Sequence, residues 1–157
     1  MFPGPVGIVS RSGSVSYEVI DQLSAAGYGQ STVVCIGGDP FVGTTYQDVL
    51  RLFARDPQTE LIIMLGEVGG DDEIRAAEVM AVDGKPVVAY IAGHAAPTGR
   101  SMGHAGAIIR RSTDTAGYKE ERLRELGVHV APLVTEVVPL VDRLFRRHDA
   151  PRRLTVT

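Results

Sequence analysis

The sequence predicts a single α/β domain in which helices cover both faces of one parallel sheet of about five strands. Short apolar runs alternate along the chain with longer segments in which apolar residues recur at helical spacing. The apolar runs are continuous rather than interrupted by polar residues, which is typical of strands buried on both faces. With 157 residues, of which 44% are hydrophobic, the chain is long enough for one domain with a hydrophobic core.

The apolar runs expected to form the sheet have the length of buried strands. In chain order they are Val6–Val9, Thr32–Ile36, Leu61–Leu65, Pro86–Ile91 and Val128–Val130. Strand–helix–strand units within one parallel sheet connect by right-handed crossovers, so the alternation indicates a doubly wound sheet. We expect the flavodoxin-like strand order.

The helices are expected between these runs, where apolar residues line one helix face. They are Ser14–Ala26, Thr44–Arg55, Asp71–Val82, Tyr118–Leu126 and Val134–Arg147. Ser14 is a candidate N-cap of the first helix, and Gly27 is a stop signal. The acidic residues that open the third helix suit the positive end of its dipole. The domain is expected to span residues 1–147, with a solvated tail over residues 148–157.

Charge and cysteine content exclude several classes of function. The formal net charge is −3, from 16 basic and 19 acidic residues, so no nucleic-acid partner is expected. The single cysteine, Cys35, cannot form an internal disulfide or a cysteine-based zinc site, which favours a cytoplasmic location. The apolar segment near the N-terminus is too short for a signal peptide or a membrane span, so no membrane partner is expected.

Most of the 18 glycines follow the predicted strands or end the predicted helices. In a parallel sheet these loops meet at the carboxyl edge, where open α/β folds bind ligands. After the first strand, Ser12, Gly13 and Ser14 lead into a helix. Free backbone N–H groups, two hydroxyls and the helix dipole suit a phosphate or a carboxylate there. N-capping by Ser12 or Ser14 alone is the alternative explanation.

Two further loops at this edge carry ionisable residues. Glu67 stands among glycines after the third strand, and it could orient an imidazole or act as a base. Alternatively, it only caps the helix that begins near Asp71. The connection over residues 93–106 exceeds the usual length of about two to six residues and contains His94 and His104. Either imidazole could be a phosphoryl-accepting nucleophile, a general base or a metal ligand, and composition does not choose between them.

Several common ligand motifs do not occur in the sequence. The Gly-Lys-Ser/Thr of a phosphate-binding P-loop is missing, and the segment Gly7–Gly13 does not form the dinucleotide motif. The 4 histidines show no spacing typical of metal ligands, so no metal site is expected within this domain.

The loops carry motifs that occur together in one protein family. They are Gly7–Gly13 followed by Ser16–Glu18, then Ile36–Thr44, then Leu65–Gly70 and, most specifically, Met102–Ile109. In this order the motifs resemble the C-terminal ligase domain of the succinyl-CoA synthetase alpha subunit. Its relatives, the NDP-forming acyl-CoA synthetases and ATP-citrate lyase, are similar too. The resemblance extends from Gly4 to about Phe145, and it implies a flavodoxin-like fold.

The resemblance implies roles for particular residues. In that family the histidine of the Gly-His-Ala-Gly motif is phosphorylated during turnover, and here that residue is His104. The family's glutamate that orients this imidazole corresponds to Glu67. The helix start that holds the phosphoryl group corresponds to Ser12, Gly13 and Ser14. The implied reaction forms an acyl phosphate from acyl-CoA and phosphate, moves the phosphoryl group to the histidine and passes it to a nucleoside diphosphate.

The resemblance also implies partners. Family alpha subunits carry a CoA-binding Rossmann domain before the first of these strands, and an ATP-grasp domain or subunit binds the nucleotide. This chain starts at that strand, so CoA, ATP or GTP and Mg²⁺ are expected to bind through partners rather than to this domain alone. The segment that follows His104 resembles the citrate-lyase branch, whereas Ile36–Phe41 resembles the succinate branch. The acyl substrate, whether succinate, malate, citrate or another acid, is therefore open.

Three functions of different classes are compatible with the sequence. A CoA ligase domain with a phosphohistidine is favoured because His104, Glu67 and Ser12–Ser14 occur together. A non-catalytic subunit that keeps the fold and docks onto partners is the main alternative, since the CoA-binding domain is not in the chain. A small-anion binder that uses only the helix start at Ser12 is the third.

Overall fold

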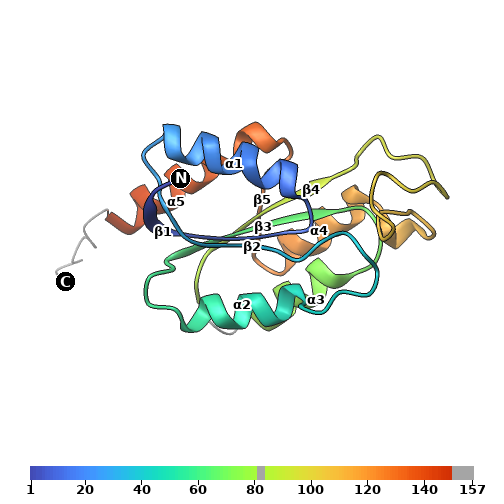
Figure 1. Cartoon of the computed structure of the whole chain (residues 1–157), viewed down its shortest axis with the longest axis horizontal. Coiled ribbons are helices and arrows are strands. Elements are labelled where there is room, and N and C mark those ends of the chain that lie inside the picture. Colours follow the sequence, from blue (N-terminus) through green and yellow to red (C-terminus); the bar gives the residue numbers. More distant parts are fainter. Residues whose placement is uncertain (81–83, 150–157) are drawn as a thin grey trace, which may run out of the picture.

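The computed structural model describes residues 1–80 and 84–149, and it consists of one sheet between two layers of helices (Figure 1). The strands are β1 (Pro3–Ser10), β2 (Gln30–Cys35), β3 (Leu61–Glu67), β4 (Val87–Ala92) and β5 (His129–Val130). The helices are α1 (Gly13–Ala25), α2 (Tyr46–Arg55), α3 (Asp72–Met80), α4 (Ala116–Glu125) and α5 (Val137–Asp149). Two 3₁₀ turns, η1 (Ser112–Asp114) and η2 (Val134–Glu136), precede α4 and α5.

The sheet has the topology that the sequence predicted. All strand pairings are parallel, and the order is β2-β1-β3-β4-β5, which is flavodoxin-like. β3 lies at the centre, and every one of its residues is buried. Its pairing with β1 ends where Ser10 lies opposite Leu65, but its pairing with β4 continues to Glu67 opposite Ala92. The carboxyl end of β3 therefore projects beyond β1.

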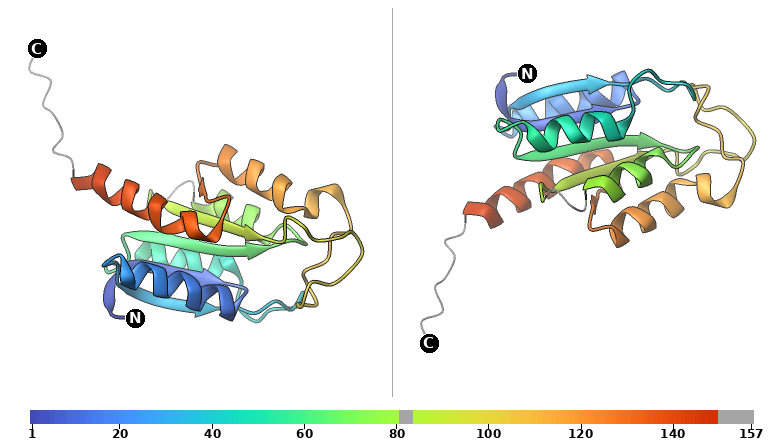
Figure 2. Two further views of the ribbon diagram at one scale, coloured as in Figure 1. Left: turned by 90° about the horizontal axis from the view of Figure 1, so that it is seen from above. Right: turned by 90° about the horizontal axis from the view of Figure 1, so that it is seen from below.

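Two hydrophobic clusters fill the space between the sheet and the helices. On one face, Leu61, Ile63 and Leu65 of β3 pack with residues of α1 and α5. On the other face, Ile62 and Met64 pack with residues of α2, α3 and α4. Figure 2 shows these two helical layers on opposite sides of the sheet. Burial on both faces explains why the β3 sequence is an uninterrupted apolar run.

The first helix begins one residue earlier than the sequence predicted. Ser12 is its N-cap, because the side chain of Ser12 accepts a hydrogen bond from the backbone N–H of Val15 at 3.3 Å. The prediction that Ser14 caps this helix is therefore wrong. Gly27, with φ of +86°, ends the helix as predicted.

The other helix boundaries also follow side-chain caps. Thr45 forms a capping box with Asp48, so α2 begins at Tyr46. Thr115 caps α4, which begins before the predicted Tyr118. The predicted end of the third helix falls on residues 81–83, outside the described residues. α5 continues to Asp149, past the expected domain boundary at residue 147, and the rest of the expected tail, residues 150–157, is also outside the described part.

The parallel sheet brings the loops after β1, β2, β3 and β4 to one edge. The connection over residues 93–111 extends beyond this edge, beside the loop that follows β2 (Figure 2). The backbone N–H of Gly106 donates to the carbonyl of Gly38 at 2.9 Å and joins the two loops. Within the described residues, no helix has the length and apolar character needed to cross a bilayer.

Candidate functional site

Glu67 is the last residue of the central strand and the starting point of the site. It lies on β3 rather than in the loop beyond Leu65, where the sequence predicted it. The residue is only 8% exposed, so its carboxylate needs a hydrogen-bonding partner. Its Oε2 atom lies 2.7 Å from Nδ1 of His104. The carboxylate thus contacts an imidazole, not the start of α3 as in the alternative interpretation.

The imidazole of His104 is oriented by this contact. Its Nδ1 atom faces Glu67, and its side chain is 35% exposed. A carboxylate accepts hydrogen bonds, so the contact favours a proton on Nδ1 and leaves the lone pair on Nε2. Among the described residues, no hydrogen bond engages Nε2. Nε2 is therefore available to react.

Glycines allow the histidine loop to come close to the loop after β2. A Cβ atom added to Gly38 would lie 2.1 Å from Cγ of His104, so the ring packs directly on the backbone there. Ser101 Oγ donates to the carbonyl of His104 at 2.6 Å and fixes the loop from within. Gly103, with φ of +89°, supplies a backbone conformation that other residues rarely adopt.

A buried arginine lies beside the pair. Nη1 of Arg11 is 3.9 Å from Oε1 of Glu67, and Nη2 of Arg11 forms an ion pair with Asp72. Burial, and next the charge of Glu73, raise the pKa of Tyr46, whose ring lies 6.0 Å from the guanidinium carbon. The guanidinium of Arg11 supplies positive charge near Oε1 of Glu67, the carboxylate oxygen that does not contact His104.

Ser12, Gly13 and Ser14 lie at the same edge of the sheet, at the start of α1. The hydrogen bonds of Ser12 stay within its own segment: it caps Val15, and its backbone N–H donates to Ser10 Oγ at 3.0 Å. Within the described residues, no hydrogen bond connects these three residues to His104. The first turn of α1 holds no acidic residue, so its positive dipole end is not neutralised there.

Lys119 and Glu73, which the sequence did not mark as site residues, form a buried ion pair behind Glu67. A signal for both exists in the sequence. Each belongs to a set of residues at helical spacing that faces the core. These sets are Glu73, Ala76, Ala77 and Met80 on α3, and Lys119, Glu120 and Leu123 with Ala116 on α4. Charges of opposite sign at positions of an apolar stripe indicate a buried pair.

The other histidine of the long connection, His94, forms a pair of its own. Nε2 of His94 lies 2.7 Å from Oε1 of Glu120, and Arg124 donates to the other carboxylate oxygen at 3.1 Å. The side chain of His94 is 50% exposed. His94 and His104 therefore lie in separate pairs, and the structure does not bring His94 to Glu67.

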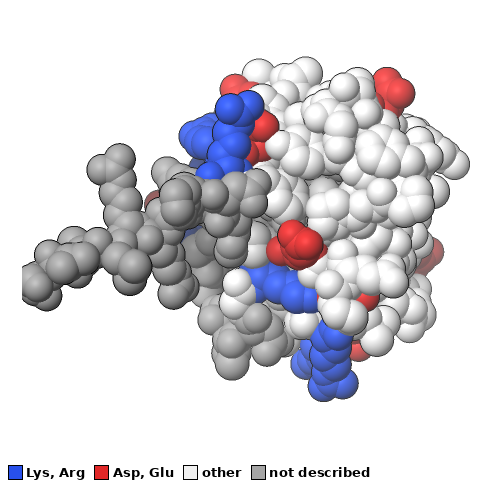
Figure 3. Space-filling view, turned by 90° about the vertical axis from the view of Figure 1, so that its left-hand side faces the viewer, with Lys and Arg blue, Asp and Glu red and all other residues white. Residues whose placement is uncertain are grey.

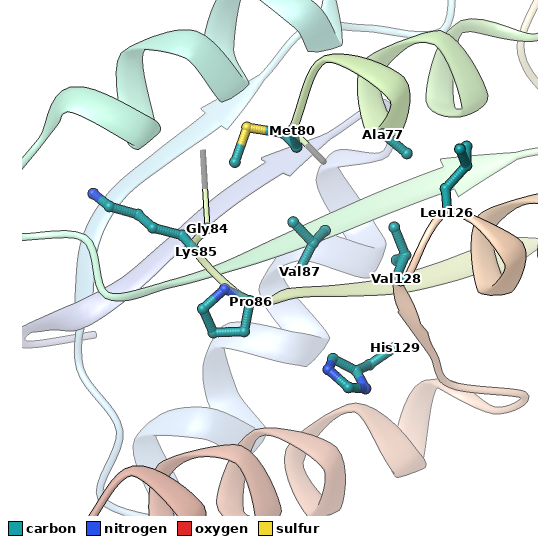
Figure 4. A pocket seen from close by; sticks show the side chains of 10 residues that line it. Ala77, Met80, Gly84, Lys85, Pro86, Val87, Leu126, Val128 and His129 are labelled. Atoms are coloured by element: carbon teal, nitrogen blue, oxygen red, sulfur yellow. The ribbon is translucent and has the colours of Figure 1, made fainter. Parts of the chain in front are cut away.

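Several hollows of the described surface lie at the opposite, amino edge of the sheet. A pocket of about 350 Å³ there is lined by residues that include Met80, Lys85, Val87 and His129 (Figure 4). The surface at this end is largely uncharged, with scattered charges of both signs (Figure 3).

We assign the site to the carboxyl edge, since the oriented imidazole, the buried carboxylate and the open helix end meet there. In the described part of the chain, no cluster of three or more His, Cys, Asp or Glu could hold a metal ion.

Comparison with protein families and sequences gives a consistent result. A family model for CoA-ligase matches residues 9–129. The chain is 50% identical over 142 residues to succinate–CoA ligase [ADP-forming] subunit alpha 1 of Archaeoglobus fulgidus, covering 90% of this chain and 49% of that protein. It is 53% identical over 144 residues to the corresponding alpha subunit of Aquifex aeolicus, covering 91% and 47%. The chain thus spans about half the length of these relatives.

A solved structure has the same fold. ATP citrate lyase of Methanosaeta concilii, in complex with (3S)-citryl-CoA, superposes with a TM-score of 0.81 at 32% sequence identity. The match covers 93% of this chain and 25% of that one. The residues matched by the family model include every site residue that the sequence predicted, from Ser12 to His104.

Proposed function

The chain belongs to the CoA-ligase family, and we propose that it is the phosphohistidine-carrying domain of an NDP-forming acyl-CoA synthetase. The observation that carries this proposal is the contact between Nδ1 of His104 and the buried carboxylate of Glu67 at 2.7 Å. It leaves Nε2, the ring nitrogen farthest from the backbone, as the nucleophile. His104 and Glu67 are thus the proposed catalytic residues.

The proposed reaction has three steps. Phosphate attacks the thioester carbonyl of an acyl-CoA, the C–S bond breaks, CoA leaves as the thiolate, and an acyl phosphate remains. Nε2 of His104 then attacks the phosphorus, and the P–O bond to the acyl group breaks to release the carboxylate. Finally, the terminal phosphate oxygen of a nucleoside diphosphate attacks the phosphorus, and the P–N bond returns its electron pair to Nε2. In the reverse direction, the nucleoside triphosphate drives the synthesis of acyl-CoA.

Glu67 contributes through the proton on Nδ1. While Nε2 bonds to phosphorus, the ring gains positive charge, which the carboxylate stabilises at hydrogen-bonding distance. Ser12, Gly13 and Ser14 are proposed to bind the phosphoryl oxygens, since the positive end of α1 lies at this edge without an acidic neighbour in its first turn.

The remaining components are proposed to come from partners. An ATP-grasp subunit or domain would bind ATP or GTP with Mg²⁺, and a Rossmann-type domain would bind CoA. Succinate is the first acid to test, because the relatives that share 50% and 53% of their aligned residues with this chain are named succinate–CoA ligases. Malate and citrate are the next candidates. We expect the complete enzyme to work in the cytoplasm.

Phosphorylation of the chain tests the proposal. The purified chain is incubated with Mg²⁺ and radiolabelled acetyl or succinyl phosphate, and separately with labelled ATP and an ATP-grasp subunit of a succinate–CoA ligase. We expect an acid-labile, alkali-stable label, which mass spectrometry locates on His104. His104→Asn should abolish the label, and His94→Asn should retain it.

Two results would overturn the proposal. One is a wild-type chain that takes label from neither donor, and the other is equal labelling of His104→Asn. If the wild-type chain and His104→Asn both bind the ATP-grasp subunit but neither takes label, the chain would instead be the non-catalytic docking subunit.

A further inference from the structure

A buried ion pair lies behind the carboxylate that contacts His104. Nζ of Lys119, on α4, is 2.7 Å from Oε2 of Glu73, on α3, and the two side chains are 0% and 1% exposed. Nζ also donates to the backbone carbonyls of Glu67 at 2.7 Å and Gly69 at 2.6 Å. All three N–H groups of the ammonium are therefore used within the protein.

Glu67 needs these contacts because its strand projects beyond a neighbour. Along a strand, successive residues direct their backbone groups to opposite sides, and Val68 bonds to Ala92 of β4. The groups of Glu67 point to the other side, where the pairing of β1 has ended opposite Leu65. Glu73 Oε1 accepts from the N–H of Glu67 at 3.2 Å, while Lys119 donates to its carbonyl. The ion pair thus supplies hydrogen-bonding partners for both backbone groups of Glu67, the N–H and the C=O, which a neighbouring strand would otherwise provide.

The strand itself leaves room for this arrangement. A Cβ atom added to Gly66 would lie 2.5 Å from Oε1 of Glu73. The glycine therefore lets the Glu73 carboxylate lie against the backbone of β3, at the position from which it reaches Glu67.

We propose that Lys119 and Glu73 are positioning residues that fix the backbone of Glu67, so that its carboxylate holds the Nδ1–H form of His104. A buried ion pair stabilises a fold little, if at all, compared with apolar side chains of similar volume. Positioning therefore explains the pair better than stability does. The kinetic part of the proposal rests on the proposed phosphohistidine function, whereas the effect on the tautomer of His104 does not.

The test uses a double variant, Lys119→Met with Glu73→Gln, which removes both charges and leaves no unpaired ion in the core. Lys85→Met is the matched control. Nζ of Lys85 also donates to two backbone carbonyls, those of Phe53 and Asp56, at 2.6 and 2.7 Å, but at the amino edge. Thermal unfolding first establishes that each variant is folded.

Two readouts follow. Nitrogen-15 NMR of His104 at mildly alkaline pH measures the fraction of Nδ1–H tautomer, which should fall in the double variant and remain unchanged in Lys85→Met. The rate of phosphorylation of His104 should fall by at least about tenfold, an effect of the size found when hydrogen bonds that orient metal-ligating imidazoles are removed. A merely structural role would change stability but neither readout.

A folded double variant with the wild-type tautomer and rate would overturn the proposal. If the double variant does not fold, Glu73→Asp decides, because it keeps the charge opposite Lys119 but withdraws the carboxylate from the N–H of Glu67. An unchanged tautomer in Glu73→Asp would then overturn it. Should the wild-type chain take no label at all, the tautomer still tests the positioning separately from the proposed function.

Discussion

The two histidines of the long connection after β4 each contact a carboxylate at the same distance, but the two imidazole–carboxylate pairs have different surroundings. Nδ1 of His104 contacts Glu67, and Nε2 of His94 contacts Glu120, each at 2.7 Å. The two pairs therefore engage opposite ring nitrogens. Nε2 is the nitrogen farthest from the backbone and suits attack on a phosphoryl group, whereas Nδ1 lies next to Cβ and is hindered.

The two carboxylates also differ in their second oxygen. Arg124 donates to Oε2 of Glu120, so both oxygens of that carboxylate have a hydrogen-bond partner. Oε1 of Glu67 is buried without a hydrogen-bond partner among the described residues, with Arg11 at 3.9 Å. Glu120 thus divides its two oxygens between the His94 imidazole and the Arg124 guanidinium, whereas the carboxylate of Glu67, among the described residues, hydrogen-bonds only to His104. The two imidazole–carboxylate pairs therefore differ in environment although their contact distances are equal.

Replacing each carboxylate by its amide should give the largest difference between the pairs. The amide of Glu67→Gln can donate to Nδ1 and would stabilise the tautomer whose proton blocks Nε2. We expect phosphorylation of His104 to slow by at least about 100-fold, since holding the imidazole of a serine protease in the wrong tautomer slows catalysis by about 10⁴-fold. Glu120→Gln should leave the rate unchanged. Rates are measured by labelling, and equal slowing in both variants would contradict the distinction between the pairs.

The strands, their order and the edge that holds the site could be predicted from the sequence. The run from Leu61 to Leu65 is apolar because both faces of β3 are covered, and this is a local signal. Several helices begin at residues other than those the sequence predicts, because the N-cap residue, and not the apolar pattern, determines where a helix begins. Ser12 rather than Ser14 caps α1, and Thr45 caps α2.

The internal arrangement of the site depends on contacts between residues far apart in the chain. Lys119 and Glu67 are separated by 52 residues, and no local pattern shows that the lysine reaches the carbonyl of the glutamate. The resemblance to a family selected His104, but the residues alone did not distinguish it from His94. That distinction depends on which ring nitrogen faces a carboxylate, which only the folded chain determines.

Packing under the imidazole is the next largest difference that can be tested. Gly38→Ala would add a Cβ atom 2.1 Å from Cγ of His104 and displace the ring from Glu67. Because the reacting nitrogen would move out of position, we expect phosphorylation to slow by about 10-fold or more. Gly43→Ala, in the same loop, is the control because an added Cβ there meets nothing within 4 Å. The prediction fails if the two variants are labelled at the same rate.

Two helix N-caps should separate anion binding from stability. Ser12 caps α1 at the proposed phosphate site, and Thr45 caps α2. Replacement by alanine should cost about 1 kcal/mol of unfolding free energy in either case. Only Ser12→Ala should also lower phosphorylation, by several-fold, because its hydroxyl is proposed to contact the phosphoryl group. Chemical denaturation and labelling measure the two effects, and a Thr45→Ala variant that loses as much label would show that stability alone matters.

The smallest effect concerns the fastening of the loop that carries both histidines. Asp114 ends this loop: its Oδ2 accepts from the N–H groups of Arg110 and Arg111, each at 2.9 Å, and its carbonyl accepts from Gly69 at 2.8 Å. Burial opposes the charge of Asp114, but the backbone N–H groups and then the Arg111 guanidinium outweigh it and hold the pKa below the ordinary 3.8.

The sign of the pH dependence follows from that lowered pKa. Because the folded chain binds the Asp114 proton more weakly than the unfolded chain, the charged carboxylate stabilises the fold at pH values above 3.8. That contribution disappears as the pH falls through the lowered value. Asp114→Asn should therefore reduce the unfolding free energy by about 2 kcal/mol at neutral pH, and this difference should shrink in acid. Urea denaturation across this range measures it, and a difference that stays constant with pH would mean that the loop is fastened by shape and not by the charge of Asp114.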